Sequence, residues 1–448
     1  MQPRKQPPGT QAGARPAAPP RTYRLAVRAL GLLAPLAARW SPKLAAGLRG
    51  RAESAIAFAH WGATGRDPAR PLLLAHAASA GELRQLEPVL VRLRARHPGW
   101  QLAVTCFSPS GLPVAADLGA DLAGLLPWDV PRAVAALLDH LRPTALVLTR
   151  AEVWPELLGA ASARGIRLGL LAATVPSRSR RLRWPARQLL AGALGSLEVV
   201  GATSPEDAAR LRQLGVRPEA LQVTGDPRAD AVLERLEQAA APTQEPATLV
   251  AGSTWPADEA VLLAAFRSVR EQHPDARLLL VPHEPTPGHL AGLRARARAA
   301  GFGEVPAFGA RDDGAPARVV ESVGGLALLY GLGRIAYVGG GFGGAGLHSV
   351  LEPAAAGMPI LVGPEGRRNP DAVQLNEVGA LEWLPRRRTT AVLEAWWATW
   401  LTDPAWCRRA GASARECVAR ARGAAERSAA LVERLMAETR GGGPEARP

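Results

Sequence analysis

Histidine and glutamate side chains follow a glycine-rich turn near the end of this sequence, in a pattern typical of phosphate binding. Glycines 339–341, 343, 344 and 346 come directly after the apolar run Ile335–Val338, and His348 and Glu352 follow, four residues apart. A helix beginning near Leu347 would carry both side chains on one face and direct its N-terminal N–H groups at a bound phosphate. A purely structural tight loop is the alternative, because glycine also suits such turns.

Carboxylates stand at comparable places in the first half of the chain. Glu82 closes the segment His76–Glu82, which follows a strand-like apolar run, and Glu152 follows a second such run at 145–148. A glutamate at this position can act as a general base if burial raises its pKa toward the working pH. It can also serve only to complement the dipole of the following helix.

Hydroxyl, imidazole and guanidinium groups complete the candidate chemistry. Ser253 and Thr254 end a strand-like run, and His283 ends the next one; such groups suit a phosphate or a pyrimidine ring, although Ser and Thr are also ordinary helix caps. Arg178 and Arg181 belong to the densest basic cluster of the chain. This cluster is either a solvated helix face or a site for a multiply anionic acceptor, which arginine binds bidentately.

A long alternation of strand-like and helix-like segments positions these residues. Strands are expected at 72–76, 102–106, 145–148, 168–171, 199–202, 221–223, 248–251, 278–281, 319–321, 335–338 and 360–362. Helices are expected between them, near 82–96, 131–141, 153–164, 180–194 and 205–214, and again over 388–437. The alternation predicts α/β architecture with parallel sheets covered on both faces. Two Rossmann-like domains facing a central cleft are therefore expected, with ligands beyond the carboxyl ends of the strands.

Length and composition set the domain boundaries. The 448 residues exceed the size at which a single core stops growing, and the Pro-containing segment 241–246 is the expected linker. We expect a disordered basic tail at 1–21, a first domain at 51–240, a second at 247–437 and a disordered tail at 438–448. The segment 22–50 is either a helix in a membrane interface or a helix packed on the first domain, because its apolar run is too short to span a bilayer.

The net charge of +14 is carried almost entirely by arginine, which indicates compositional bias together with a preference for anionic partners. Nucleic acid is disfavoured, since no recognised binding motif accompanies the charge. The three cysteines predict no disulfide framework, and no motif predicts a metal site or a cofactor.

Taken together, these motifs resemble the 3-deoxy-D-manno-octulosonic acid (Kdo) transferases of lipopolysaccharide assembly, which are glycosyltransferases of the two-Rossmann GT-B type. The resemblance spans roughly residues 23 to 430. It rests on the segments HAASAGE (76–82), TCFSPSG (105–111), LPWDVP (126–131), EVWPELL (152–158), VTGDPRAD (223–230), AGST (251–254), VPHEP (281–285) and the glycine stretch 334–364.

The resemblance implies a role for each candidate residue. Glu82 would be the catalytic base of an inverting, metal-independent transfer of Kdo from CMP-Kdo to a lipid A precursor, lipid IVA. Glu152, Arg178 and Arg181 would lie on the acceptor side, in the first domain. The second domain would hold the donor through Ser253, Thr254, His283, Gly339, Gly340, Gly341, His348 and Glu352.

The implied location is the cytoplasmic face of the inner membrane, with peripheral contact to anionic lipid. Ser349 stands where family members commonly have Asn, many members have an Arg in the segment where this chain has Pro282, His283 and Glu284, and the glycine loop is longer. The alternatives are a GT-B enzyme that uses a UDP-sugar or a different CMP-activated acid, and a nucleotide-sugar-binding homologue without turnover.

Overall fold

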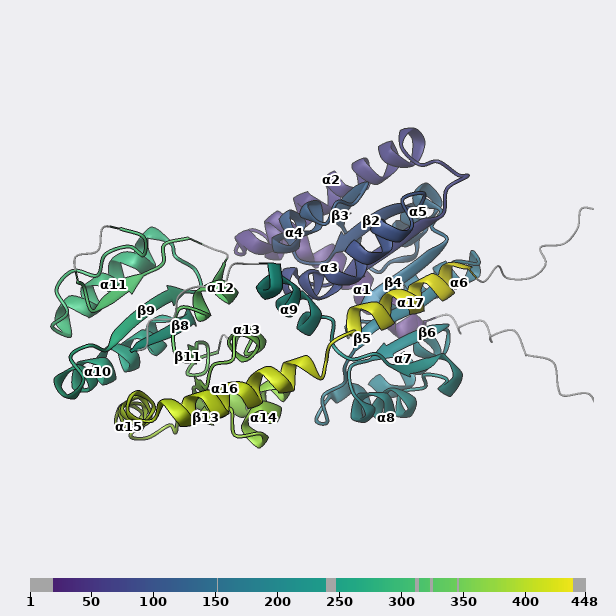
Figure 1. Ribbon diagram of the computed structural model, residues 1–448. Coiled ribbons are helices and arrows are strands. Elements are labelled where there is room, and N and C mark those ends of the chain that lie inside the picture. The colour runs from purple at the N-terminus through teal and green to yellow at the C-terminus, as the bar shows by residue number, and fades with distance from the viewer. Residues whose placement is uncertain are drawn as a thin grey trace, which may run out of the picture. The chain divides into compact units, whose positions relative to one another are not determined.

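The computed structural model describes residues 19–150, 152–238, 247–310, 314–322, 325–344 and 346–437. The chain forms two compact units, shown in Figure 1: unit 1 contains the chain up to Arg228 and again from Gly423, and unit 2 runs from Ala229 to Arg422. The expected linker 241–246 and the expected tails, apart from residues 19–21, lie outside the described residues.

Unit 1 is built on a seven-stranded sheet whose neighbouring strands are all parallel. Its strands are β1 (Leu72–Ala77), β2 (Gln101–Cys106), β3 (Leu122–Leu125), β4 (Ala145–Thr149), β5 (Arg167–Ala173), β6 (Val199–Ala202) and β7 (Leu221–Val223). They lie in the order β3-β2-β1-β4-β5-β6-β7. The winding direction therefore reverses between β1 and β4, and the carboxyl ends of these two strands are where a doubly wound sheet binds its ligand.

Helices cover both faces of this sheet. They are α1 (Arg21–Ala37), α2 (Pro42–Thr64), α3 (Ala80–Arg96), α4 (Leu112–Asp117), α5 (Pro131–Leu141), α6 (Pro155–Ala163), α7 (Ala186–Gly195), α8 (Pro205–Gln213) and α17 (Ala424–Ala437), while α9 (Arg228–Gln238) leads into unit 2. The strands are apolar on both sides for this reason: Leu72 and Leu74 enter one core, and Leu73 and Ala75 enter the other.

The last helix lies in unit 1, although the second domain was expected to extend to residue 437. Helix α17 (yellow in Figure 1) packs on α3 and β5 and buries Ala425, Ala429, Val432 and Leu435. These apolar positions recur every three or four residues, so they share one helix face. Their pattern predicts a buried helix, but it does not say which sheet buries it.

Unit 2 repeats the same topology with six parallel strands. The strands are β8 (Thr248–Thr254), β9 (Arg277–Pro282), β10 (Ala317–Val319), β11 (Ile335–Val338), β12 (Ile360–Val362) and β13 (Leu381–Trp383), in the order β10-β9-β8-β11-β12-β13. Its further helices are α10 (Pro256–Gln272), α11 (Pro287–Ala299), α12 (Leu326–Tyr330), α13 (Leu351–Ala355), α14 (Pro370–Glu377), α15 (Thr389–Thr402) and α16 (Pro404–Ala419). The reversal falls between β8 and β11, so the segments after these strands form the ligand edge of unit 2.

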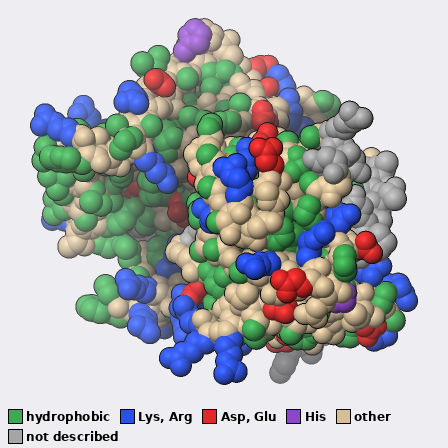
Figure 2. Space-filling view, turned by 90° about the vertical axis from the view of Figure 1, so that its left-hand side faces the viewer, with side chains coloured by type: hydrophobic (Ala, Val, Ile, Leu, Met, Phe, Trp, Pro, Cys, Tyr) green, Lys and Arg blue, Asp and Glu red, His purple; other side chains and the backbone are tan. Residues whose placement is uncertain are grey.

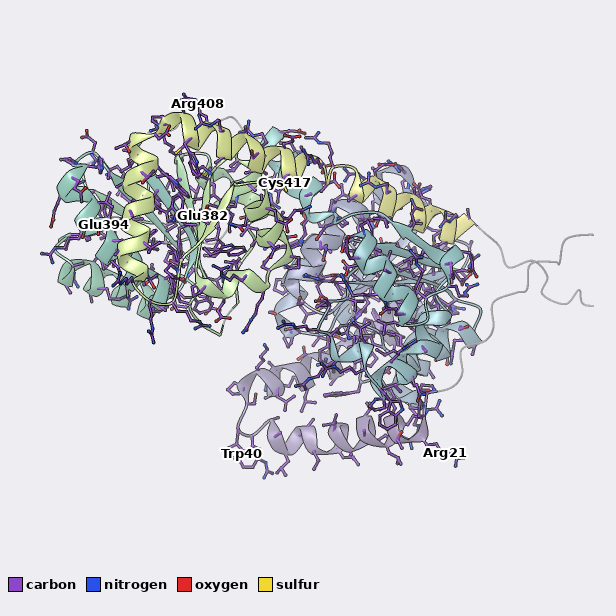
Figure 3. All side chains as sticks on the ribbon, turned by 90° about the horizontal axis from the view of Figure 1, so that it is seen from below. Arg21, Trp40, Glu382, Glu394, Arg408 and Cys417 are labelled. Atoms are coloured by element: carbon purple, nitrogen blue, oxygen red, sulfur yellow. The ribbon has the colours of Figure 1, made fainter. Side chains whose placement is uncertain are left out.

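The N-terminal segment forms two helices, where a helix was expected within residues 22–50. Helix α1 is fixed to unit 1 at its start, where the Tyr23 hydroxyl donates to Asp129 at 2.6 Å and Arg24 pairs with Glu156. Further along, only Ala34 of α1 is buried. Figure 3 shows α1 on the outside of unit 1, from Arg21 to the turn at Trp40. No described helix combines the length and apolarity needed to cross a bilayer.

Charged side chains are mixed on the surface. On the face shown in Figure 2, Arg and Lys side chains form separate groups among acidic and apolar ones. The excess of arginine is therefore distributed over this face and does not form one continuous basic surface there.

Candidate active site

Glu82 lies at the ligand edge of unit 1, directly after β1. Ser79 caps α3 by accepting a hydrogen bond from the Glu82 N–H at 3.4 Å, and this places Glu82 in the first turn of the helix. The carboxylate folds back and accepts a hydrogen bond from the Ala78 N–H at 2.8 Å. One carboxylate oxygen is thereby held by the backbone.

Burial and two arginines determine the protonation of Glu82. Burial raises the pKa of Glu82, and the Ala78 hydrogen bond, Arg150 and Arg181 act in the opposite direction. Burial also raises the pKa of Glu152, as does the negative charge of Glu82, while Arg181 lowers it. The structure therefore brings Glu82, Glu152 and Arg181 close enough for their charges to interact.

A small pocket is lined by the two arginines that act on Glu82, and neither carboxylate is part of its lining. Its volume is about 50 Å³, and its lining includes Arg150, Arg181 and Thr174 together with seven aliphatic side chains. Arg150 follows β4 with a φ of 73°, a left-handed conformation that is costly for arginine and is enriched at functional sites. Arg178 is exposed, and within the described residues it forms no hydrogen bond or ion pair with either carboxylate. Of the two predicted acceptor-side arginines, only Arg181 faces them.

His76 is a structural histidine in this motif. It is 1 % exposed, its Nε2 accepts from the Trp154 indole at 3.3 Å, and its Nδ1 lies 3.0 Å from the Thr105 hydroxyl. Burial lowers the pKa of His76 to about 3, so the ring is neutral. Trp154 in turn stacks on Phe107, with ring centroids 5.0 Å apart, so the ends of β1, β2 and β4 are joined by side chains.

In unit 2, Ser253 and Thr254 differ in their surroundings. Ser253 is half-buried and has a φ of 53° at a β-bulge between β8 and β9. Thr254 is fully buried, and its hydroxyl donates to Glu259 at 3.2 Å. The Thr254 hydroxyl proton is therefore used inside the fold, and the proposed donor-binding role of Thr254 stays a prediction.

The glycine run is shaped by the protein itself. A Cβ on Gly339 would collide with the carbonyl oxygen of Ser253, one on Gly340 with that of Gly346, and one on Gly341 with the backbone of Gly363. The Gly339 N–H donates to the Gly252 carbonyl, and the Gly340 N–H donates to Asp258. These two N–H groups are already used within the protein, which is what the structural alternative expects for this part of the loop.

The helix expected at Leu347 begins four residues later. Helix α13 spans only Leu351–Ala355, and His348 lies in the loop before it. A five-residue helix contributes little dipole, and His348 and Glu352 do not share a helix face. Glu352 lies 4.0 Å from Arg235. The open part of the loop consists of Gly343 and Gly344, whose Cβ positions face empty space.

Asp258 is the residue that the sequence reasoning missed. It is 1 % exposed, and its carboxylate accepts from the Tyr337 hydroxyl at 2.6 Å, the Gly340 N–H at 3.0 Å and the Trp255 N–H at 2.9 Å. One carboxylate thus joins β11, the glycine loop and the turn after β8. Asp258 lies three residues after Trp255, at the start of α10, which is the usual position of a capping carboxylate. This position in the sequence could have indicated its role.

Three rings meet at the same edge. His283 stacks on His348 with centroids 4.0 Å apart, and Trp255 lies 5.1 Å from His283. The Trp255 indole donates to His348 Nε2 at 2.9 Å. The structure thus brings together His283 and His348, both of which the sequence analysis assigned to the donor side. It also places Trp255 against them, and the sequence analysis did not name Trp255.

Comparison with known proteins identifies the family. Residues 52–231, which contain Glu82, Glu152 and Arg181, match the family described as 3-deoxy-D-manno-octulosonic-acid transferase (kdotransferase). The 3-deoxy-D-manno-octulosonic acid transferase of Bordetella pertussis is 30% identical over 436 residues, which cover 92% of this chain and 98% of that protein. The chain belongs to the Kdo transferase family. It is therefore an enzyme of the glycosyltransferase class.

Solved structures agree with this fold for the Kdo transferase chain. A glycosyltransferase from Rickettsia africae superposes with a TM-score of 0.53 at 9% identity, covering 83% of this chain and 100% of that one. The UDP-GlcNAc 2-epimerase of Neisseria meningitidis gives a TM-score of 0.54 at 13% identity, covering 78% and 99%. At such identities the likeness concerns the fold alone, which is the two-Rossmann GT-B architecture.

Proposed function

We propose that this Kdo transferase transfers Kdo from CMP-Kdo to a lipid A precursor, lipid IVA, with inversion and without a metal ion. The observation that carries this proposal is the state of Glu82: a carboxylate at the switch point of unit 1, held by the Ala78 N–H at 2.8 Å, with its pKa raised by burial. A raised pKa makes a carboxylate a better proton acceptor near neutral pH.

In the proposed reaction Glu82 takes the proton of an acceptor hydroxyl. The hydroxyl oxygen forms a bond to the anomeric carbon of Kdo, and the bond from that carbon to the phosphate oxygen breaks. CMP leaves with the electron pair. Glu152 and Arg181 lie near Glu82 and are proposed to position the acceptor, since their charges act on the same carboxylate.

The donor is proposed to bind at the ligand edge of unit 2. Ser253 lies near the end of β8, and His283 and His348 follow β9 and β11, with the open backbone of Gly343 and Gly344 in the same loop as His348. CMP-Kdo carries a phosphodiester and a carboxylate, and both need hydrogen-bond donors that are not already used within the fold.

We also propose that α1 lies in the cytoplasmic interface of the inner membrane. Six large apolar side chains on or just after it are between 51% and 81% exposed: Leu25, Leu30, Leu32, Leu33, Leu36 and Trp40. Arg28, Arg39 and Lys43 are also exposed. Exposed leucines with flanking cations are typical of helices that lie in the plane of an anionic membrane, where the acceptor lipid would be.

Glu82→Gln tests the proposed reaction. With CMP-Kdo and a tetraacylated lipid A precursor, the wild-type protein should release CMP without added metal, and the variant should be slower by about 10² to 10⁴-fold. Its affinity for CMP, measured by calorimetry, should be unchanged. Glu87→Gln is the matched control, because Glu87 lies on the same helix. Equal rates for Glu82→Gln and wild type would refute the base assignment, and tighter binding of UDP than CMP would refute the donor.

A further inference from the structure

The hydrogen bond between Trp255 and His348 determines which ring nitrogen of His348 carries a proton. An indole N–H is a donor only, so His348 Nε2, 2.9 Å away, must be the acceptor. A neutral imidazole has one donor and one acceptor nitrogen. The proton of neutral His348 is therefore on Nδ1.

The surroundings of His348 keep it neutral. Burial lowers its pKa to about 4, and the neighbouring His283 adds to this effect. Burial also lowers the pKa of His283, against the charge of Glu284. At neutral pH both stacked rings are therefore uncharged, and His348 can offer a single directed N–H.

The backbones of Trp255 and His348 are each held by a hydrogen bond. The backbone N–H of Trp255 donates to the Asp258 carboxylate, which also accepts the Gly340 N–H. The backbone N–H of His348 donates to the Gly339 carbonyl at 3.2 Å. The backbone at both ends of the Trp255–His348 hydrogen bond is thus held at the start of the glycine loop, and turning either ring would break the hydrogen bond from the indole to Nε2.

The Nδ1 side of His348 is open. Within the described residues Nδ1 has no hydrogen-bond partner, and it is not among the buried atoms that lack one. An N–H that is fixed in direction, accessible and unused is suited to an oxygen of a bound ligand. The phosphate contact expected from Gly339 and Gly340 is excluded by their internal hydrogen bonds, which leaves His348 as a fixed donor at this edge.

We propose that Trp255 is a positioning residue, which holds His348 in the Nδ1–H form so that His348 donates a hydrogen bond to an anionic phosphate oxygen of the sugar nucleotide. This inference rests on the proposed donor site in unit 2. It adds a specific assignment: Trp255 does not contact the ligand itself but acts through His348. The competing explanation is that the contact only packs the loop.

The first experiment needs no ligand. The ¹⁵N signals of the two ring nitrogens of His348, assigned with the His348→Ala variant, report the tautomer directly. In the full-length wild-type protein Nδ1 should carry the proton, and in Trp255→Phe the two tautomers should exchange. The same substitution at Trp406, which lies in unit 2 outside the ring cluster, should leave the signals unchanged. An unchanged His348 tautomer in Trp255→Phe would overturn the inference.

The second experiment is a double-mutant cycle on the affinity for CMP. His348→Ala should weaken CMP binding by about tenfold or more, the usual range for a hydrogen bond to a charged group. Trp255→Phe should weaken it about three- to tenfold, and should have no further effect in the His348→Ala background. Independent, additive losses would overturn the inference. Trp255→His, which retains a ring N–H, should recover most of the affinity if the phenylalanine variant folds poorly.

The two experiments separate this inference from the proposed function. If the wild-type protein binds CMP but the cycle is additive, the donor assignment stands and the role of Trp255 is refuted. If the wild-type protein does not bind CMP, the proposed donor is refuted, and the ¹⁵N signals still decide whether Trp255 sets the tautomer of His348.

Discussion

Replacing Asp258 tests whether one buried carboxylate holds the proposed donor edge together. Its Oδ1 accepts from the Tyr337 hydroxyl, and its Oδ2 accepts from the N–H groups of Gly340 and Trp255. Asp258→Ala leaves the buried Tyr337 hydroxyl and Gly340 N–H without their partner. Each orphaned buried donor costs about 1–3 kcal/mol, so the two together cost about 2–6 kcal/mol.

Removing the buried charge of Asp258 offsets part of this loss of stability. Burial raises the pKa of Asp258, which means that the folded protein holds this charge at some expense. We therefore expect a net loss near the lower half of the range, about 3 kcal/mol. For a domain of about 150–250 residues, each kcal/mol lowers Tm by about 2–4 °C, so unit 2 should melt about 6–12 °C lower.

Asp258→Asn is the discriminating control. An amide oxygen in the place of Oδ2 can still accept from Gly340 and Trp255, and the amide NH₂ can donate to the Tyr337 hydroxyl, which can rotate to accept. The Tyr337 O–H then has no acceptor, so the asparagine variant leaves one buried donor unpaired where the alanine variant leaves two. It should therefore lose about 1–2 kcal/mol and keep its affinity for CMP, while the alanine variant should lose about 3 kcal/mol and bind CMP more weakly. Thermal unfolding and calorimetry measure the two effects. An alanine variant as stable as wild type, or an asparagine variant as damaged as alanine, would refute this account of the hydrogen bonds.

Three further predictions concern the other parts of the site. Arg181 lowers the pKa of Glu82, so Arg181→Gln should raise this pKa and shift the acid limb of the pH profile of kcat/KM to higher pH. The control substitution Arg187→Gln, at an exposed arginine, should leave the profile unchanged. A shift to lower pH would contradict the effect assigned to Arg181. Gly339→Ala should destabilise unit 2 by about 2 kcal/mol or more in thermal unfolding because of the collision with Ser253, while Gly343→Ala, which faces open space, should stay within about 0.5 kcal/mol. Exchanging exposed Leu32 and Leu33 for Glu should reduce binding to anionic vesicles more than 100-fold, since burying two leucines contributes about 3 kcal/mol or more. The control variant Ile56→Glu, on α2, should bind vesicles like wild type. Equal loss of binding in both variants would argue against α1 as the membrane contact.

The strand pattern was the most readable part of the sequence. Buried parallel strands are apolar on both faces, so runs such as Leu72–Ala77 and Ile335–Val338 are recognisable without structural information. The short strands β3 (Leu122–Leu125) and β13 (Leu381–Trp383) were missed. Each lies at the edge of its sheet, where partial burial weakens the apolar signal.

The candidate residues were recognised by type, and their roles depended on contacts. Glu82 and Glu152 follow β1 and β4, and the strand order makes these two strands neighbours at the switch point. Thr254 was indistinguishable from Ser253 in the sequence, yet its side chain points into the core. A hydroxyl after a strand can face either way, because side chains alternate along the strand and a single bulge changes the alternation.

The sequence by itself determined the α/β class, the two-domain organisation, the family and the set of polar groups at the strand ends, since these depend on local periodicity and on residue type. Only the tertiary structure decided which of those groups are free. The N–H groups of Gly339 and Gly340 are used by Gly252 and Asp258, and Trp255 sets the proton of His348, through contacts between residues 82 to 93 positions apart. No local pattern encodes such contacts, because they form only when β8 and β11 lie side by side in the sheet.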